Sequence, residues 1–387
     1  MRLVTLIAAI AFAAAILVIS LTGGSGGGSS TGSAGPLVSG AGPTHHKGRF
    51  APPLLDPTDV YAADRPDRLS PVVRHFPSLV YVPNSDSNTV SVINPRTYKV
   101  IRQFPVGVNP QHVVPSYDLM TLWVNNDQGN SLTAIDPRTG KPERTIPVSD
   151  PYNLYFTPDG RYAIVVSERL SRLDFRDAQT MRLRHSLPVP CAGPNHMDFS
   201  ANGRYLLLSC EFDGKVIEVD LADQRVIGSL TLAPGASPQD VKLSPDGKVF
   251  YVADLHLNGV WIVDAVRPRK LGFIPTGPAA HGLYVSRDSH YLYVSNRSGG
   301  SISVISLATR KVVHTWPIPG GGSPDMGNVS ADGKVLWMSG RYNGVVYAIS
   351  TRNGKLLARI PVGDGPHGLC VYPQPGRYSL GHTGIMR

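Results

Sequence analysis

Seven polar side chains recur along the chain at regular intervals, each one to three residues after a proline. Imidazole nitrogens and carboxylate oxygens are ligands that zinc, copper or iron ions accept, and several such groups in one concavity form a typical ligand site. The sequence therefore predicts a polar site for a small ligand, a metal or a partner, formed by His112, Asn153, His196, Asp240, His281, Asp325 and His367.

The histidines in this set are the natural candidates for metal binding, and the candidates are His196, His281 and His367. The cofactor stays unidentified; a transition metal is the class that these ligands would suit. A structural role is the alternative, because polar side chains where strands begin also satisfy the backbone groups of turns. The varying distance from the proline means that the seven side chains need not point at one spot. No catalytic residue can be assigned.

A repeated sequence motif of apolar strands and tight turns must position these residues. Residues 238–253 (PQDVKLSPDGKVFYVA) show its form: a proline, a polar residue, an apolar run, Asp-Gly and a second apolar run. Asp-Gly between such runs marks a tight hairpin. About 42 residues that make four strands are the size of one β-propeller blade. The motif begins at Pro110, Pro151, Pro194, Pro238, Pro278, Pro324 and Pro366.

The two ends of the repeat region predict how the ring closes. The unit that begins near Leu79 lacks a first strand, while residues 365–373 (GPHGLCVYP) form a first strand with nothing after it. Pairing of this last strand with the first unit would complete a ring and remove exposed strand edges. The predicted fold is all-β: a seven-bladed β-propeller with four-stranded blades, closed by the C-terminal strand in blade 1.

Short motifs in these units resemble a known family. Residues 81–84 (YVPN), 251–253 (YVA) and 293–296 (YVSN) resemble the YVTN β-propeller repeat, and the likeness extends over residues 79–373. The family has exported bacterial members and is related to the haem d1 propeller domains of nitrite reductases; the lactonase propellers are more distant. The resemblance implies the fold and leaves several functions open. Haem d1 domains have eight blades, whereas seven units are present here.

The amino-terminal part predicts export. Leu3 to Leu21 are nineteen uncharged residues behind Arg2, as in a signal peptide or an N-terminal membrane anchor over residues 1–22. Either one places the rest of the chain outside the cytoplasm, anchored or secreted after cleavage. A Gly/Ser-rich linker over 23–43 and an extended strap over 44–77 follow. The propeller is predicted over 78–373, with a C-terminal tail over 374–387.

Composition excludes several classes of protein. The chain has 387 residues with 40 Gly and 34 Pro, which disfavours helical repeats, and 42% hydrophobic residues, which disfavours general disorder. The net charge of +9 is spread without a dense basic run, so no nucleic-acid partner is expected. We expect a monomer that contacts the membrane through its N-terminal segment, with a small ligand or a protein or cell-wall partner.

Two cysteines fall at the same end of the predicted fourth blade. Cys191 precedes its first strand and Cys210 ends its second. An exported protein permits a disulfide between them; free thiols, or metal ligation together with His196, are the alternatives. Cys370 lies in the closing strand, where a buried small apolar residue is expected.

These features favour an extracytoplasmic binding or interaction protein with a His-rich polar channel mouth. The alternatives are a metal- or haem-dependent redox protein and a lactonase-like hydrolase that use the same face of the propeller. Glu168, Glu211 and Asp254 follow second strands, on the same face as the polar residues, and could assist acid–base or metal chemistry. Whether the protein is an enzyme stays open, and the sequence leans towards binding.

Overall fold

The computed structural model describes residues 51–382 and 384–387. These residues form 28 β-strands in seven four-stranded antiparallel sheets. No part of the described chain folds into a helix with the length and apolar character needed to cross a bilayer. The predicted signal peptide or anchor over 1–22, the linker over 23–43 and the first residues of the predicted strap lie outside the described residues.

The strands follow the same order in every blade, from the channel outwards. The innermost strands of blades 1 to 7 are β28 (Cys370–Tyr372), β4 (Pro110–Pro115), β8 (Asn153–Phe156), β12 (Pro194–Phe199), β16 (Pro238–Leu243), β20 (Ala280–Val285) and β24 (Pro324–Val329). The second strands are β1 (Leu79–Asn84), β5 (Leu122–Asn126), β9 (Tyr162–Ser167), β13 (Tyr205–Cys210), β17 (Val249–Asp254), β21 (Tyr291–Asn296) and β25 (Val335–Gly340).

The two outer strands complete each blade. The third strands are β2 (Thr89–Asn94), β6 (Ser131–Asp136), β10 (Arg172–Asp177), β14 (Lys215–Asp220), β18 (Gly259–Asp264), β22 (Ser301–Ser306) and β26 (Val345–Ser350). The outermost strands are β3 (Lys99–Pro105), β7 (Lys141–Pro147), β11 (Leu183–Pro188), β15 (Arg225–Thr231), β19 (Lys270–Pro275), β23 (Lys311–Pro317) and β27 (Leu356–Pro361).

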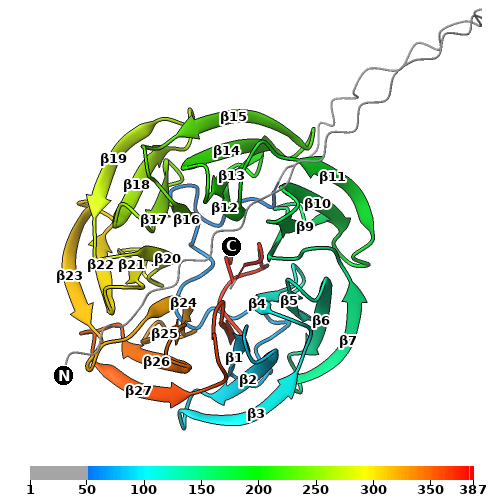
Figure 1. Ribbon diagram of the computed structural model, residues 1–387, viewed down its shortest axis with the longest axis vertical. Coiled ribbons are helices and arrows are strands. Elements are labelled where there is room, and N and C mark those ends of the chain that lie inside the picture. Colours follow the sequence, from blue (N-terminus) through cyan, green and yellow to red (C-terminus); the bar gives the residue numbers. More distant parts are fainter. Residues whose placement is uncertain (1–50, 383) are drawn as a thin grey trace, which may run out of the picture. The chain divides into compact units, whose positions relative to one another are not determined.

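The ring closes through the C-terminal strand, and the prediction of a seven-bladed propeller is confirmed. β28 pairs antiparallel with β1, with Leu79 opposite Tyr372 and Tyr81 opposite Cys370. Figure 1 shows the seven sheets around a common centre, with β28 and β1 in one blade although they lie at opposite ends of the repeat region.

Burial falls from the channel to the rim. Every residue of the innermost strand β12 is buried, whereas the outermost strand β15 alternates exposed and half-buried residues. The apolar side chains between neighbouring blades form the core; Phe175 of blade 3 and Met197 of blade 4 belong to one such cluster. The core is thus built at the blade interfaces, and the innermost strands are held rigidly enough to position polar side chains.

A β-bulge interrupts five of the innermost strands where the polar residues occur. In blade 4 the residues between Pro194 and Met197 face one residue of β13, Ser209. The Ser209 hydroxyl accepts a hydrogen bond from the His196 amide at 3.0 Å and donates one to the His196 carbonyl at 3.1 Å. The same register shift occurs in β4, β16, β20 and β24. Such a bulge redirects two consecutive side chains towards the channel.

Both segments that flank the repeats pack against the propeller. In the described part of the predicted strap, the Val60 amide donates to the Pro245 carbonyl at 2.8 Å. The segment predicted as a C-terminal tail lies at the centre of the ring (Figure 1). The Arg387 guanidinium is buried there and lies 3.0 Å from the Asp198 carboxylate. This segment therefore contributes to the channel interior.

Candidate functional site

The bulges sort the predicted site residues into two levels of the channel. His281 and Asp325 are the first of the two bulged residues in their strands, whereas His112, His196 and Asp240 are the second. His281 lines the pocket at the channel mouth, and none of the three second residues does. We call the level of the first bulged residues the mouth level and the level of the second bulged residues the deep level. A single residue of register therefore decides the depth at which a side chain lies.

The same distinction explains the uneven spacing from the prolines. Asp325 and His367 directly follow Pro324 and Pro366, and His281 directly follows Ala280, the first residue of β20. The structural equivalent of the repeated proline in blade 6 is thus Ala280, two residues after Pro278. In the five bulged strands, the residue one position after the strand start belongs to the mouth level, and the residue two positions after it belongs to the deep level.

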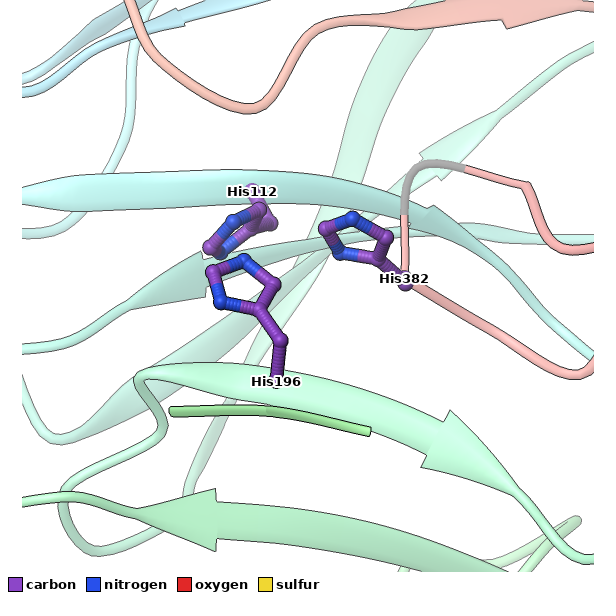
Figure 2. A group of neighbouring side chains, drawn as sticks. All are labelled: His112, His196 and His382. Atoms are coloured by element: carbon purple, nitrogen blue, oxygen red, sulfur yellow. The ribbon is translucent and has the colours of Figure 1, made fainter. Parts of the chain in front are cut away.

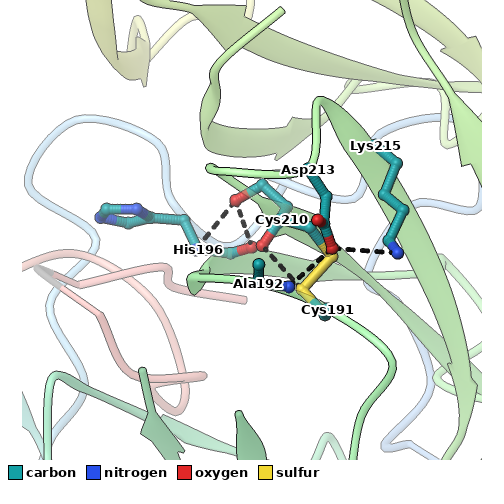
Figure 3. Close-up of a disulfide and its surroundings, with 7 residues drawn as sticks. Cys191, Ala192, His196, Cys210, Asp213 and Lys215 are labelled. Atoms are coloured by element: carbon teal, nitrogen blue, oxygen red, sulfur yellow. Dashed lines mark hydrogen bonds and ion pairs between the residues drawn. A yellow bond between two sulfur atoms is a disulfide. The ribbon is translucent and has the colours of Figure 1, made fainter. Parts of the chain in front are cut away.

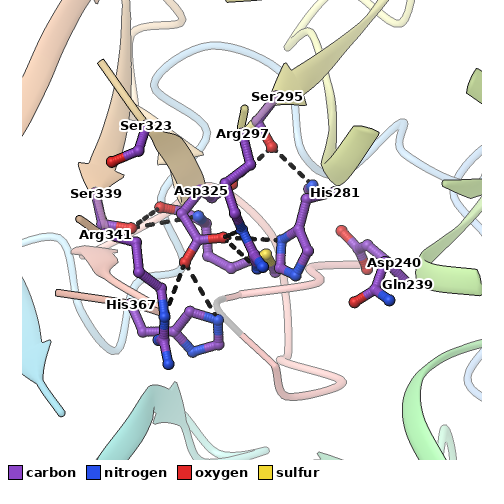
Figure 4. A network of polar contacts seen from close by, with 12 residues as sticks. Gln239, Asp240, His281, Ser295, Arg297, Ser323, Asp325, Ser339, Arg341 and His367 are labelled. Carbon is purple, nitrogen blue, oxygen red and sulfur yellow. Dashed lines mark hydrogen bonds and ion pairs between the residues drawn. The ribbon is translucent and has the colours of Figure 1, made fainter. Parts of the chain in front are cut away.

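Asp325 is the centre of the mouth level. One carboxylate oxygen, Oδ1, accepts a hydrogen bond from Arg297 Nε at 2.6 Å and lies 3.1 Å from His281 Nδ1. The other, Oδ2, lies 3.4 Å from His367 Nε2 and 3.9 Å from Arg341 Nε. Figure 4 shows both arginines and both imidazoles directed at this one buried carboxylate. Two guanidinium groups thus compensate its charge.

The side chains that surround this carboxylate also line a polar pocket of about 390 Å³. Its volume is within the range of pockets that bind small molecules. Burial, and secondarily the charge of Glu211, raises the pKa of Glu168 at the pocket wall to about 8. The pocket therefore holds a protonated carboxyl near neutral pH, and Arg297 and Arg341 line the same pocket. The lining includes Gln111, Tyr152, Glu168, Glu211, Gln239 and Arg341.

The deep level is a cluster of three histidines, shown in Figure 2. His112 from β4, His196 from β12 and His382 from the C-terminal segment each have a ligand atom within 4.8 Å of the others. All three side chains are buried. Burial lowers the pKa of His112 to about 3 and holds those of His196 and His382 well below the usual value. The imidazoles are therefore neutral at physiological pH, which is the form that ligates metals.

The three predicted metal candidates lie on different levels. His196 joins the deep cluster, whereas His281 and His367 group with Asp325 at the mouth level. The two levels are close, because the His196 and His281 ring centroids are 6.1 Å apart. The predicted residues thus all reach the channel but form two clusters in place of one.

The remaining predicted residues contact the deep cluster. The Asn153 side-chain amide nitrogen lies 3.2 Å from His382 Nδ1, and Asp240 Oδ1 lies 3.7 Å from His382 Nε2. Asp240 also accepts backbone hydrogen bonds from Val241 and Leu283. It therefore links blades 5 and 6 as well as facing the histidines.

Several residues of the site were not identified from the sequence. Arg297 and Arg341 follow second strands as Glu168 and Glu211 do, so their position in the repeat places them at the mouth. His382 lies outside the repeats, and one signal could have suggested it. The strand that closes the ring is an innermost strand, so the residues that follow it start at the channel wall. Of the three carboxylates considered, Asp254 instead accepts a hydrogen bond from Trp261 Nε1 at 2.8 Å.

A disulfide stabilises one part of the mouth rim. Cys191 and Cys210 are joined, and Asp213 in the following turn accepts a hydrogen bond from the Ala192 amide at 2.6 Å (Figure 3). Glu211, directly after Cys210, accepts a hydrogen bond from the Asn195 side chain at 2.6 Å. The free thiol, Cys370, is buried in the closing strand.

Comparisons with curated proteins give partial matches. A Salmonella typhi protein described as uncharacterized protein YncE is 27% identical over 136 residues, which cover 34% of this chain and 38% of that protein. A 6-phosphogluconolactonase of Serratia proteamaculans is 27% identical over 208 residues, 51% of this chain and 52% of its own length. The chain thus spans about half or less of these relatives.

A solved structure and a family model cover more of the chain. The dihydro-heme d1 dehydrogenase NirN superimposes with a TM-score of 0.58 at 17% identity, over 79% of this chain and 76% of that one. At this identity the likeness shows the fold alone. The model of the YNCE-like beta-propeller matches residues 69–375. The chain therefore belongs to the YNCE-like β-propeller family.

Proposed function

We propose that this protein is an extracytoplasmic binding protein whose channel mouth receives a small polar solute with an anionic group. One observation carries the proposal: Arg341 Nη1 is buried at the mouth and makes no hydrogen bond to any described residue. A buried unpaired polar group costs free energy. A carboxylate or phosphate oxygen would recover that cost through a charge-assisted hydrogen bond.

The rest of the pocket suits a solute that also carries hydroxyl groups. Glu168 retains its proton near neutral pH, so it can donate a hydrogen bond without repelling an anion. The amides of Gln111 and Gln239 line the same pocket and can both donate and accept. Arg297 is already engaged with Asp325 and Arg169 with Asp150, which leaves Arg341 as the principal anion contact. Sugar acids and their phosphates have this combination of groups, and the partial match to a 6-phosphogluconolactonase supports the same class.

Calorimetric titration of the full chain tests the proposal. The probes are gluconate, 6-phosphogluconate, inorganic phosphate and uncharged glucose. We expect an anionic probe to bind and glucose not to bind. Arg341→Ala should weaken anion binding by roughly tenfold to a hundredfold, since a charge-assisted hydrogen bond is worth about 1.5–3 kcal/mol.

The matched control is Arg359→Ala in the same blade. Arg359 lies on the exposed outer strand β27 and donates to the Pro319 and Gly321 carbonyls. This variant should bind the anion as the unmodified chain does. The proposal fails if none of the anionic probes binds, or if binding is unchanged in Arg341→Ala.

The location outside the cytoplasm has two supports. Leu3 to Leu21 form an uncharged segment of nineteen residues, and the Cys191–Cys210 disulfide is a bond that oxidising compartments maintain. Fractionation of expressing bacteria, with thiols blocked at lysis, should find the protein in the membrane or extracytoplasmic fraction. One reactive cysteine, Cys370, should appear after denaturation. A cytoplasmic protein with three reactive thiols would exclude this location.

The two catalytic alternatives stay predictions. The likeness to a haem d1 protein and the partial match to a lactonase concern the fold and part of the chain, respectively. Neither comparison identifies a residue of this channel that would react with a substrate.

A further inference from the structure

We propose that His112, His196 and His382 form a binding site for one first-row transition-metal ion of the zinc or copper class. The site lies at the deep level, below the proposed anion pocket, and it includes a residue from the C-terminal segment. It does not depend on the anion proposal, because the two sites use different side chains.

The first support is the convergence of three neutral imidazoles. Their ligand atoms lie within 4.8 Å of one another. Tetrahedral zinc with Zn–N bonds of about 2.0–2.1 Å needs nitrogens roughly 3.4 Å apart. Small rotations of the side chains would therefore close the site. Imidazole donors of this kind suit zinc and copper better than magnesium or calcium, which prefer oxygen.

The second support is the hydrogen-bonding state of the ring nitrogens. Four of them have no partner among the described residues: His112 Nε2, His382 Nε2 and both nitrogens of His196. Each unpaired buried polar atom costs on the order of 1–3 kcal/mol. One metal ion would accept three lone pairs at once and remove most of this cost.

The orientation of His112 is already suited to coordination. Its Nδ1 lies 3.0 Å from the Tyr152 carbonyl oxygen. A carbonyl can only accept a hydrogen bond, so Nδ1 carries the proton of the neutral ring and Nε2 keeps a free lone pair. A ligating histidine whose other nitrogen donates to a carbonyl is the usual arrangement in metal sites.

His382 requires one rearrangement. Its Nδ1 lies 3.2 Å from the Asn153 amide nitrogen. Coordination through Nε2 places the ring proton on Nδ1. A half-turn of the Asn153 amide would then present its oxygen to that proton, in exchange for the hydrogen bond that this oxygen accepts from the Leu154 amide at 2.9 Å. Asn153 would thereby fix the tautomer that the metal needs.

Charge favours the deep level over the mouth level for a cation. The carboxylate of the His281, Asp325 and His367 cluster is already paired with Arg297 at 2.6 Å, and Arg341 is 3.9 Å away. At the deep level Asp240 lies 3.7 Å from His382. Lys242, whose charge contributes to lowering the pKa of His196, also acts on Asp240. The negative charge of Asp240 offsets the positive charge of Lys242.

The test uses the full chain, produced without an affinity histidine tag and stripped with a chelator. The protein is loaded with Zn²⁺, Co²⁺ or Cu²⁺ in anion-free buffer and desalted, and the metal per chain is measured by mass spectrometry. We expect one tightly held ion. X-ray absorption of the unmodified zinc-loaded protein should show three imidazole nitrogens at about 2.0–2.1 Å.

Two variants assign the site. His382→Ala and His196→Gln should each lower metal affinity by about 100-fold or more, because a three-ligand site loses a ligand. The control is the double variant His45→Ala, His46→Ala, since these residues precede the propeller and could bind metal adventitiously. It should retain one ion per chain. Circular dichroism checks that each variant is folded, and the absorption measurement needs no variant.

Other outcomes would overturn the proposal. They are no ion retained by the unmodified chain, fewer than three imidazoles in the absorption spectrum, or retention unchanged in the folded His382→Ala variant. Loss of metal in His281→Ala but not in His382→Ala would place the ion at the mouth level and contradict the assignment. Anion binding through Arg341 is measured separately, so the failure of one proposal does not decide the other.

Discussion

At the residue scale, the channel is built from polar groups whose ionisation is set by burial. Burial raises the pKa of Glu168 to about 8 and that of Asp127 to about 7, while it lowers the pKa of His112 to about 3. Near neutral pH Glu168 thus holds its proton and the His112 imidazole is neutral. Removing charge is the response expected where a group leaves water. The mouth is consequently less charged than its composition suggests.

Glu168 gives a prediction about stability and pH. The folded protein keeps this proton up to about pH 8, whereas the unfolded chain releases it near the reference value of 4.5. The folded state therefore binds more protons between these values, and stability falls as pH rises through the window. Glu168→Gln removes this loss. It should be more stable than the unmodified chain at pH 9, by roughly 1–3 kcal/mol, and similar at pH 4.5.

Urea unfolding from pH 4.5 to 9 measures this difference. Glu143→Gln is the control, because Glu143 is exposed on the outermost strand β7. Its stability should follow that of the unmodified chain at every pH. If the difference in stability between Glu168→Gln and the unmodified chain does not grow with pH, Glu168 is ionised in the folded protein.

At the element scale, two local features determine where the polar groups point. The bulge in the innermost strands sends one side chain to the mouth level and the next to the deep level. The C-terminal segment then brings in His382 by close backbone contact: a Cβ on Gly381, whose φ is +95°, would lie 2.5 Å from Tyr155 Cα. Gly368 similarly leaves room for the His112 ring. Glycine is needed at both positions because any side chain would fill the space.

At the scale of the whole molecule, closure of the ring protects strand edges. Six of the seven outermost strands end in proline, and they expose charged residues such as Glu143 and Lys311. Both features discourage pairing with another chain. The edge of β1 is different, because all six of its residues are buried and β28 covers it. A monomer is therefore expected while β28 is in place.

Truncation tests this role of β28. A chain that ends at Asp364 lacks the closing strand, and it should lose on the order of 5 kcal/mol of stability because Leu369, Val371 and Tyr372 are buried. It should also associate as its concentration rises, which light scattering after size exclusion would detect.

A chain that ends at Pro373 keeps β28 and is the control. It should remain a monomer, although it loses the Arg387 contact to Asp198. If both truncated chains stay monomeric, the exposed edge of β1 is not what drives association.

The regular part of the fold was predictable from sequence, and the irregular part of the site was not. Repeats of about 42 residues identified seven four-stranded blades. Each blade must bury both faces against its neighbours, so the blades were expected to form a ring. The same repeats located Asp325 and His367 near the channel. They could not assign His196 and His281 to different levels, because the starting residue of β20, Ala280, is not a proline. A difference of one residue in register is invisible in a repeat with varying loops.

The sequence by itself determined the seven blades, the closing strand and seven of the side chains that reach the channel. These follow from periodic apolar patterns, which are local and repeated. Only the tertiary structure decided that His112 and His196 meet His382, and that Asp325 is shared by Arg297 and two histidines. Such clusters depend on how separate blades and a non-repeated C-terminal segment converge on one axis. Contacts of that kind leave no fixed spacing in the chain.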